Sequence, residues 1–368
     1  MQMTRPVPSF LYAGMLALAG FVTASSRADI PGPEATLAVE TLECGDIHLQ
    51  EMSLQAEESP SSNQYVLSAT ESRIDIDYAP ARYDIVSQPM RRVEDRTAAE
   101  LNARFRANAD LVPFAGAGAY RGFTDFRSVW LDEYYRQLFS GVPGYTHVAP
   151  KGWHAMAGGR WSYVPGSAIL QVTLLQQGDT VSPGYEPQIG APLLRGRDHL
   201  RTTAVRISTE NVVTPTVRSL LEAGATSTTG RGMRYSLQES LNWAVSDTLT
   251  LRAVVAGVHE QPAFNAASAS LSLERDWNAR WFAGLSAREY RDDGEVVDPL
   301  IESDAAPALR TMSVTASLRW QGEHLAVRLE GGPYRTRYDA VALSSAQFAR
   351  LYEDRDWRRL QCTASWKF

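Results

Sequence analysis

The chain has 368 residues, of which 44% are hydrophobic and 21% charged, with 26 Gly, 19 Pro and a net charge of −6. These values exclude collagen-like repeats and low-complexity disorder, and two cysteines are too few for a disulfide scaffold. The negative charge argues against a nucleic-acid partner, because phosphate neutralisation requires an excess of Lys and Arg. The mean hydropathy of −0.26 is, taken alone, typical of a soluble protein.

Arginine dominates the basic residues. Only Lys151 and Lys367 are lysine, so 36 − 2 = 34 basic residues are arginine. Codon usage in a GC-rich genome is the simplest interpretation of this bias. Where the arginines lie along the chain is more informative than how many there are.

The first 28 residues are expected to be a secretory signal peptide. Arg5 supplies the positive charge, residues 10–22 are apolar, and Ser26 and Ala28, on either side of Arg27, place small residues at the usual cleavage positions. The apolar stretch is shorter than the ~20 residues of a spanning helix. We therefore expect an exported protein whose mature chain begins at Asp29 and carries a net charge of −6 − 2 = −8.

Apolar and polar residues alternate over long windows in the rest of the chain. In Leu309–Trp320, for example, Met312, Val314 and Leu318 alternate with polar residues. This period of two predicts β-strands with one apolar and one polar face. The predicted strands are Arg73–Tyr83, Glu100–Val112, Phe114–Gly122, Trp153–Val164, Ser167–Gln177, Arg197–Thr209, Thr216–Thr228, Arg231–Val245, Thr248–Val258, Phe264–Glu274, Ala279–Tyr290, Leu309–Trp320, Leu325–Arg337 and Trp357–Phe368.

The length of these windows favours a membrane barrel over a soluble sandwich. Strands of soluble proteins average ~5–6 residues, whereas strands that cross a membrane need ~9–11. An all-β, antiparallel, up-and-down transmembrane β-barrel satisfies its backbone by closure, with an apolar outside and a wet lumen. We predict fourteen strands, within a range of 12–16, in one barrel domain over residues 63–368. The negative mean hydropathy then follows, because half of each strand faces water.

The lengths of the connections support this interpretation. Very long connections are predicted at 123–152, 178–196, 291–308 and 339–356, and all of them fall on one end of an up-and-down barrel. Outer-membrane barrels have short periplasmic turns and longer outer loops. The pattern predicts that both termini lie in the periplasm.

The end of the chain resembles an assembly signal. Leu360, Cys362, Ala364, Trp366 and Phe368 alternate with polar residues and stop at a terminal phenylalanine. This resembles the C-terminal signal of bacterial outer-membrane barrels, with Trp366 and Phe368 as its key residues. The resemblance is to the class of outer-membrane barrels and porins, and it implies an outer-membrane location. It also implies contact with membrane lipid, lipopolysaccharide and the barrel assembly machinery. The sequence has no metal-site spacing and its two cysteines are isolated, so we expect no metal and no cofactor, and the charge argues against nucleic acid.

The polar strand face defines a candidate pore lining. Twelve arginines and six acids are predicted to point inward, which gives a lumen charge of 12 − 6 = +6. The predicted pore-lining residues are Arg104, Arg106, Arg160, Arg206, Arg218, Arg234, Arg252, Arg280, Arg288, Arg319, Arg328, Arg359, Asp75, Asp77, Asp110, Glu222, Glu274 and Glu330. Arginine favours anions in a pore, and arginine-lined barrels resemble porins for acidic sugars. The competing interpretation is that arginine–acid ladders only brace the wall.

Two segments depart from the strand pattern. Residues 127–139 place Trp130, Tyr134 and Leu138 at helical spacing, so Tyr134, Tyr135 and Arg136 are candidates for a constriction that contacts the solute. A lid on the barrel rim is the alternative. Residues 29–62 are rich in Pro, Glu and Ser, and three roles stay open: a periplasmic tail, a plug, or an extra hairpin that would make sixteen strands.

The sequence thus predicts a passive channel for small hydrophilic solutes, anionic ones or acidic sugars in particular. One alternative is a barrel that exports or anchors a surface polymer or protein. Another is an outer-membrane lipid hydrolase using His199 or His259, although no catalytic residue is assigned. Glu239 conflicts with the apolar face of its strand, which is an indication of an oligomer.

Overall fold

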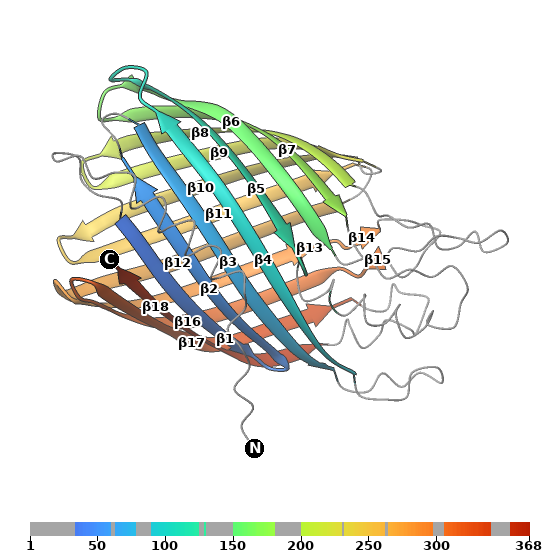
Figure 1. Ribbon diagram of the computed structural model, residues 1–368. Helices are drawn as coiled ribbons and strands as arrows, with labels where there is room; N and C mark the ends of the chain where they lie inside the picture. Colours follow the sequence, from blue (N-terminus) through green and yellow to red (C-terminus); the bar gives the residue numbers. More distant parts are fainter. Residues whose placement is uncertain are drawn as a thin grey trace.

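Sixteen antiparallel strands form one closed barrel (Figure 1). The computed structural model describes residues 34–59, 63–78, 90–124, 129, 150–180, 200–229, 232–261, 264–296, 305–339 and 354–368. The barrel strands are β1 (Glu34–Cys44), β2 (Ile47–Glu58), β3 (Asn63–Tyr78), β4 (Met90–Phe105), β5 (Leu111–Arg121), β6 (Lys151–Val164), β7 (Ala168–Thr180), β8 (Leu200–Thr214), β9 (Val217–Thr228), β10 (Met233–Ser246), β11 (Leu249–Glu260), β12 (Phe264–Asn278), β13 (Trp281–Asp292), β16 (Leu309–Gln321), β17 (Leu325–Tyr338) and β18 (Arg355–Lys367). Two short strands, β14 (Glu295–Val296) and β15 (Ala305–Ala306), pair separately.

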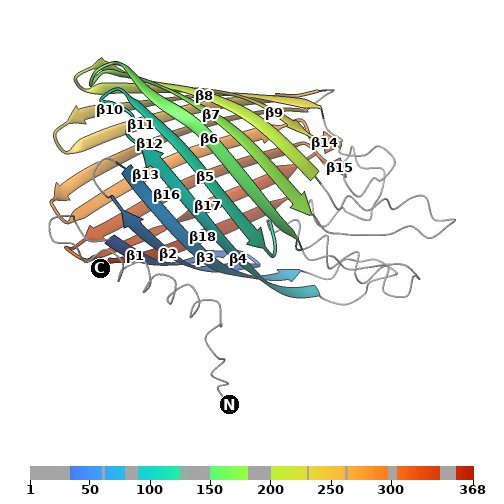
Figure 2. The ribbon, with the colours of Figure 1, turned by 45° about the horizontal axis from the view of Figure 1, so that its top comes forward.

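Each barrel strand pairs with its neighbours in the chain, and β1 closes the barrel against β18. At this seam Thr36 pairs with Lys367, and the amide of Phe368 donates to the carbonyl of Ala35 at 2.8 Å. The strands run obliquely around the barrel, and the turned view shows the same wall of tilted strands (Figures 1 and 2). The fold is therefore the predicted up-and-down barrel.

The number of strands corrects the prediction of fourteen. Residues 34–58, inside the segment left open above, form β1 and β2, so the barrel has sixteen strands. β3 begins at Asn63, ten residues before the predicted strand. The predicted strand Glu100–Val112 is also displaced, because β4 ends at Phe105 and β5 begins at Leu111. The alternation in β1 is interrupted by Thr41 and Glu43 on its outer face, which hid it in the sequence.

The strands separate the apolar residues from the polar ones. Large apolar side chains are exposed on one parity of each strand, including Leu174 (57%), Leu237 (56%) and Leu285 (56%). Trp153 and Trp161 lie toward opposite ends of the outer face of β6, eight residues or about 27 Å apart along the strand. Because such strands tilt by ~35–45°, this is about 20 Å along the barrel axis, close to the ~25 Å apolar band between the aromatic girdles of an outer-membrane barrel.

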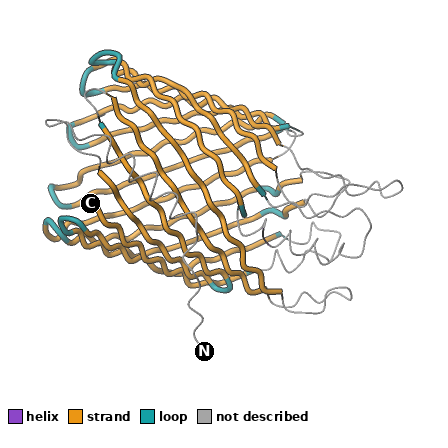
Figure 3. The backbone as a smooth tube through the Cα atoms, viewed as in Figure 1, coloured by secondary structure: helices purple, strands orange, loops and turns teal. Residues whose placement is uncertain are grey.

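Connections of different length lie at the two ends of the barrel. At the end that carries the C-terminus, the strands are joined by residues 106–110, 165–167, 215–216, 247–248, 279–280 and 322–324, and turns there appear in teal in Figure 3. The opposite end has the connections 79–89, 122–150, 181–199, 293–308 and 339–354. We call the two ends periplasmic and outer, following the rule for such barrels. In the described ranges, no helix is long and apolar enough to cross a membrane.

Candidate functional site in the lumen

Most of the predicted pore-lining residues lie on the lumen face, opposite the exposed apolar side chains. Those on the lumen parity of their strands are Arg104, Arg160, Arg206, Arg218, Arg234, Arg252, Arg288, Arg319, Arg328, Arg359, Glu222, Glu274 and Glu330. Arg106, Asp110 and Arg280 lie in periplasmic turns instead. Tyr134, Tyr135 and Arg136 lie outside the described residues, as does the side chain of Asp77.

Asp75 is placed on the outer face, contrary to the prediction. It shares the parity of Tyr65 and Leu67, and these pair with Ala103 and Leu101 on the exposed face of β4. Its carboxylate accepts two hydrogen bonds from Arg91, at 3.0 Å from Nε and 2.7 Å from Nη2. Ile74 and Ile76 defined the predicted apolar face, but they point to the lumen side and are buried there, so the wrong face was assigned to Asp75.

Several lumen carboxylates were missed by the sequence analysis. β1 and β2 contribute Glu40, Glu51 and Glu57, and β4 contributes Glu94 and Glu100. All of them lie in residues that had been left outside the predicted strands or at the edge of one. Because Arg92 and Arg96 are the only described lumen-facing bases that the same strands add, the predicted excess of six positive charges is not retained.

Some of the lumen arginines brace the wall through ion pairs. Three of these pairs join acids on the same or a neighbouring strand: Arg206 with Glu222 (3.1 Å), Arg234 with Glu260 (2.5 Å) and Arg328 with Glu330 (2.5 Å). The fourth reaches across β13, from Arg319 on β16 to Glu274 on β12 (3.5 Å). By contrast, Arg104, Arg160, Arg218 and Arg288 have no carboxylate partner among the described residues. The second group is the one available to a solute.

A cavity of about 790 Å³ lies in the lumen against strands β2 to β9. Its wall contains three arginines, Arg104, Arg160 and Arg206, and two acids, Glu57 and Glu222. Phe114 and Met156 add apolar surface. Amide and hydroxyl groups complete the lining at Gln55, Gln64, Asn102, Gln171, Thr173 and Ser208. Three positive charges against two negative ones leave the cavity with an excess of one positive charge.

Glycines shape the wall between β5 and β6. On the lumen face four large side chains are each opposed by a glycine: Phe114 by Gly158, Met156 by Gly116, His154 by Gly118 and Tyr120 by Gly152. A Cβ at position 158 would lie 2.4 Å from the Phe114 ring, and one at position 116 would lie 2.7 Å from Cε of Met156. The large side chains therefore lie flat across the neighbouring strand, which leaves the lumen open beside them.

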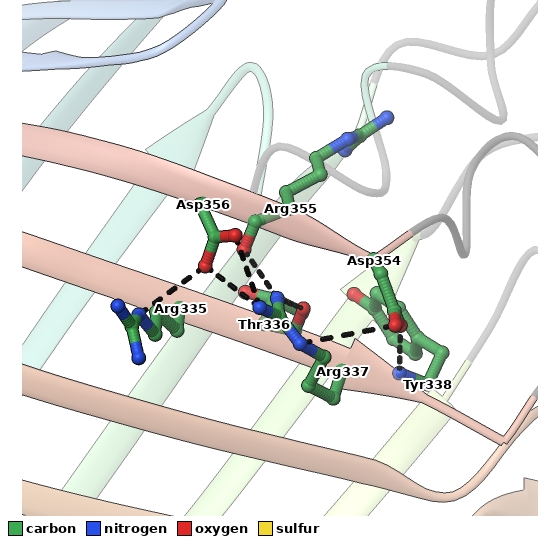
Figure 4. A network of polar contacts seen from close by, with 7 residues as sticks. All are labelled: Arg335, Thr336, Arg337, Tyr338, Asp354, Arg355 and Asp356. Atoms are coloured by element: carbon green, nitrogen blue, oxygen red, sulfur yellow. Dashed lines mark hydrogen bonds and ion pairs between the residues drawn. The ribbon is translucent and has the colours of Figure 1, made fainter.

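Charged residues also gather on the outer face, near the outer ends of β17 and β18 (Figure 4). Arg337 donates to both carboxylate oxygens of Asp356 at 2.8 and 3.0 Å, and Arg335 approaches the same carboxylate at 3.3 Å. The backbone amide of Tyr338 donates to Asp354 at 2.8 Å. This network ties the end of β17 to the start of β18 above the apolar belt.

The outer face holds no assembled hydrolase site within the described residues. His259 lies at the outer rim, where its Nδ1 and Oδ1 of Asn265 are 2.8 Å apart. No serine hydroxyl or cysteine thiol bonds to that ring in the described part of the chain. His199 lies outside the described residues.

Comparisons with known proteins identify the fold. No protein-family model matches the sequence, and no curated protein matches it. A solved bacterial polysaccharide outer membrane secretin is similar over 91% of this chain and 98% of its own, with a TM-score of 0.50 and 8% identity. CdiB from Acinetobacter baumannii has a TM-score of 0.57 and 9% identity, and the match covers 91% of this chain and 60% of CdiB. With its apolar outer belt, the chain is a bacterial outer-membrane β-barrel.

Proposed function

We propose that the protein is a passive outer-membrane channel for small hydrophilic solutes, with a preference for anionic ones such as acidic sugars. The observation that carries the proposal is the lumen cavity, where Arg104 and Arg160 are exposed and free of described carboxylate partners. Guanidinium groups without a fixed partner pair with the carboxylate of a solute. A wet, polar lumen inside a closed barrel provides the route.

The preference for anions is local to one wall. β1 and β2 carry Glu40 and Glu51 on their lumen face and no described lumen base, and the neighbouring strand β18 adds Arg359 and Lys367. Six to eight strands away in the barrel order, β9 and β11 carry Arg218 and Arg252, which flank Asn242 in one register row. An anion is expected to follow the basic wall and a cation the acidic wall, so the net selectivity is modest.

Planar-bilayer conductance tests the proposal. The wild-type channel should conduct, and its reversal potential in a KCl gradient should indicate a modest anion preference. Replacing Arg104 and Arg160 by Gln should shift the reversal potential toward cations. The matched change of Glu40 and Glu51 to Gln should shift it toward anions. Absence of conductance would refute the channel, and a cation-selective wild type would refute the anion preference.

A further inference from the structure

We infer that the lumen cavity is a binding site for a pyranose that carries a carboxylate. The sugar ring stacks on Phe114, and its carboxylate lies between Arg104 and Arg160. The inference rests on the proposed channel and names the site in it. It assigns Phe114 to the sugar ring, and Arg104 and Arg160 to the carboxylate of the sugar.

Phe114 lines the cavity and is half-buried, so part of the residue is exposed to the lumen. Its ring lies across Gly158, whose Cβ position would be 2.4 Å from Cζ and 2.9 Å from Cε2. Other lumen phenylalanines are covered, because Arg319 lies 4.1 Å from the centre of the Phe282 ring and Arg234 lies 5.2 Å from that of Phe264. The described residues place no guanidinium over Phe114. The axial C–H groups of a pyranose can therefore bury apolar surface on it.

The two arginines flank this ring. Arg104 is the direct register partner of Phe114 on β4. Arg160 lies on β6, two positions from Gly158 and opposite Val112. Arg104 donates one hydrogen bond to Oε1 of Gln64 at 3.2 Å, and both arginine residues are exposed to the lumen. A carboxylate between them would receive charge-assisted hydrogen bonds from two sides.

The acids of the cavity do not compete for these arginines. Glu57 accepts a hydrogen bond from Nε2 of Gln64 at 2.6 Å, and Glu222 pairs with Arg206 at 3.1 Å. Arg206 lies in the same register row as Phe114, beyond Gly158 and Thr173. The positive charge that remains is thus on Arg104 and Arg160, beside the aromatic face.

The rest of the lining favours a sugar over an aromatic acid. Gln55, Gln171, Thr173 and Ser208 offer amide and hydroxyl groups around the ring position. Sugar hydroxyls can pair with them, whereas a benzene ring would cover them unpaired at a free-energy cost. The volume of about 790 Å³ accommodates a mono- or disaccharide.

Four probes separate the parts of the site in current-block measurements on single channels. Glucuronate has the ring and the charge, glucose only the ring, gluconate only the charge on an open chain, and benzoate a charged ring without hydroxyls. Glucuronate should block the wild-type current at the lowest concentration. Phe114→Ala should raise the half-blocking concentration of glucuronate about tenfold, the loss of one apolar contact, and leave gluconate unchanged. Replacing Arg104 and Arg160 by Gln should weaken both sugar acids and leave glucose unchanged.

Phe282→Ala is the matched control, because its covered ring lies on β13, eight strands from β5. It should leave the block by glucuronate unchanged. Calorimetric titration of the full chain in detergent with glucuronate gives a second readout that needs no current. Any of three results would overturn the site in a conducting channel: equal block by all four probes, stronger block by benzoate than by glucuronate, or an unchanged glucuronate block in Phe114→Ala. Absence of conductance with retained glucuronate binding would overturn only the channel.

Discussion

The ring of Phe114 occupies the space that a side chain at position 158 would fill. The two residues face each other across β5 and β6, and a Cβ at position 158 would also lie 2.2 Å from the carbonyl oxygen of Val172. The ring can move, but the backbone carbonyl of β7 cannot move without breaking the sheet. Glycine at position 158 is therefore required both for the close approach of β6 to Val172 of β7 and for the position of the Phe114 ring in the proposed site.

Gly158→Ala should destabilise the folded barrel by about 2 kcal/mol, since overpacking forces backbone shifts. Gly159→Ala is the matched control, because its added Cβ would face the outside and meet only Leu111, at 3.9 Å. Urea unfolding in lipid vesicles, with heat-modified gel mobility as the assay of folding, compares the two. Equal stability of the two variants would contradict the close approach to Val172.

Arg234→Gln should also destabilise the barrel, because it removes the cation beside Glu260, a residue that is 8% exposed. Breaking a buried pair costs ~3–5 kcal/mol. The Arg234 side chain is 37% exposed to the wet lumen, so we expect about 2 kcal/mol. The double variant with Glu260→Gln should recover most of the loss in the same unfolding assay. A double variant as unstable as the single one would show that the arginine acts through its other contacts, such as Phe264.

Glu239 lies on the outer face of β10, between Leu221 and Val255, where lipid is expected. Its carboxylate accepts a hydrogen bond from Oγ of Ser219 at 3.0 Å. A charge on the lipid face is unfavourable, so Glu239→Leu should stabilise the barrel by about 1 kcal/mol and Ser219→Ala should destabilise it. A loss of stability in Glu239→Leu would instead indicate a polar partner on this face, and cross-linking in membranes would then identify an oligomer.

Acid should loosen the contact between the start of β12 and the end of β13, where Asn265 meets Asp293. Burial raises the pKa of Asp293. The backbone and side-chain amides of Asn265, 2.6 and 2.7 Å from its carboxylate oxygens, together with smaller contributions, lower the pKa by more than burial raises it, so the pKa lies below its ordinary value of 3.8. Because the pKa is lowered in the folded state, the ionised Asp293 carboxylate stabilises the fold above pH 3.8. This stabilisation is lost as the pH falls through the folded-state pKa. Hydrogen exchange of the Asn265 amide, corrected for its intrinsic rate, should speed up below about pH 4. Asp293→Asn should remove that dependence, and an unchanged acid response would refute the assignment.

The sequence predicted the barrel from its period of two, but the alternation is weak in β5, whose predicted start at Phe114 falls three residues after the observed start at Leu111. The reason is physical: the outer face of β5 carries Ala115, Ala117 and Ala119, and the lumen face carries Gly116 and Gly118. Such small residues weaken the apolar contrast on which period counting depends. The same glycines form the wall of the cavity. Local sequence rules are expected to fail at functional positions for this reason.

The charge of the lumen was predicted less well than its polarity. Arg104, Arg160 and Arg206 could be assigned to the inside from parity alone. Glu40 and Glu51 could not, because β1 and β2 carry Thr41, Glu43, His48 and Gln50 on their outer faces and do not look like lipid-facing strands. Which arginines are paired depends on contacts across strands, such as the one between Arg206 and Glu222, and register is required to find them.

The seam between β1 and β18 also determines when the barrel can form. Oγ1 of Thr363 donates to Glu40 at 3.4 Å, and these residues are 323 positions apart in the chain. Contacts between residues so distant in sequence form slowly. Until the last strand is delivered, β1 and β17 each expose a row of unpaired backbone groups that can pair with other chains. The pairing of β18 with β1 is therefore the step that commits this protein to its folded state, and the open barrel requires protection from aggregation until then.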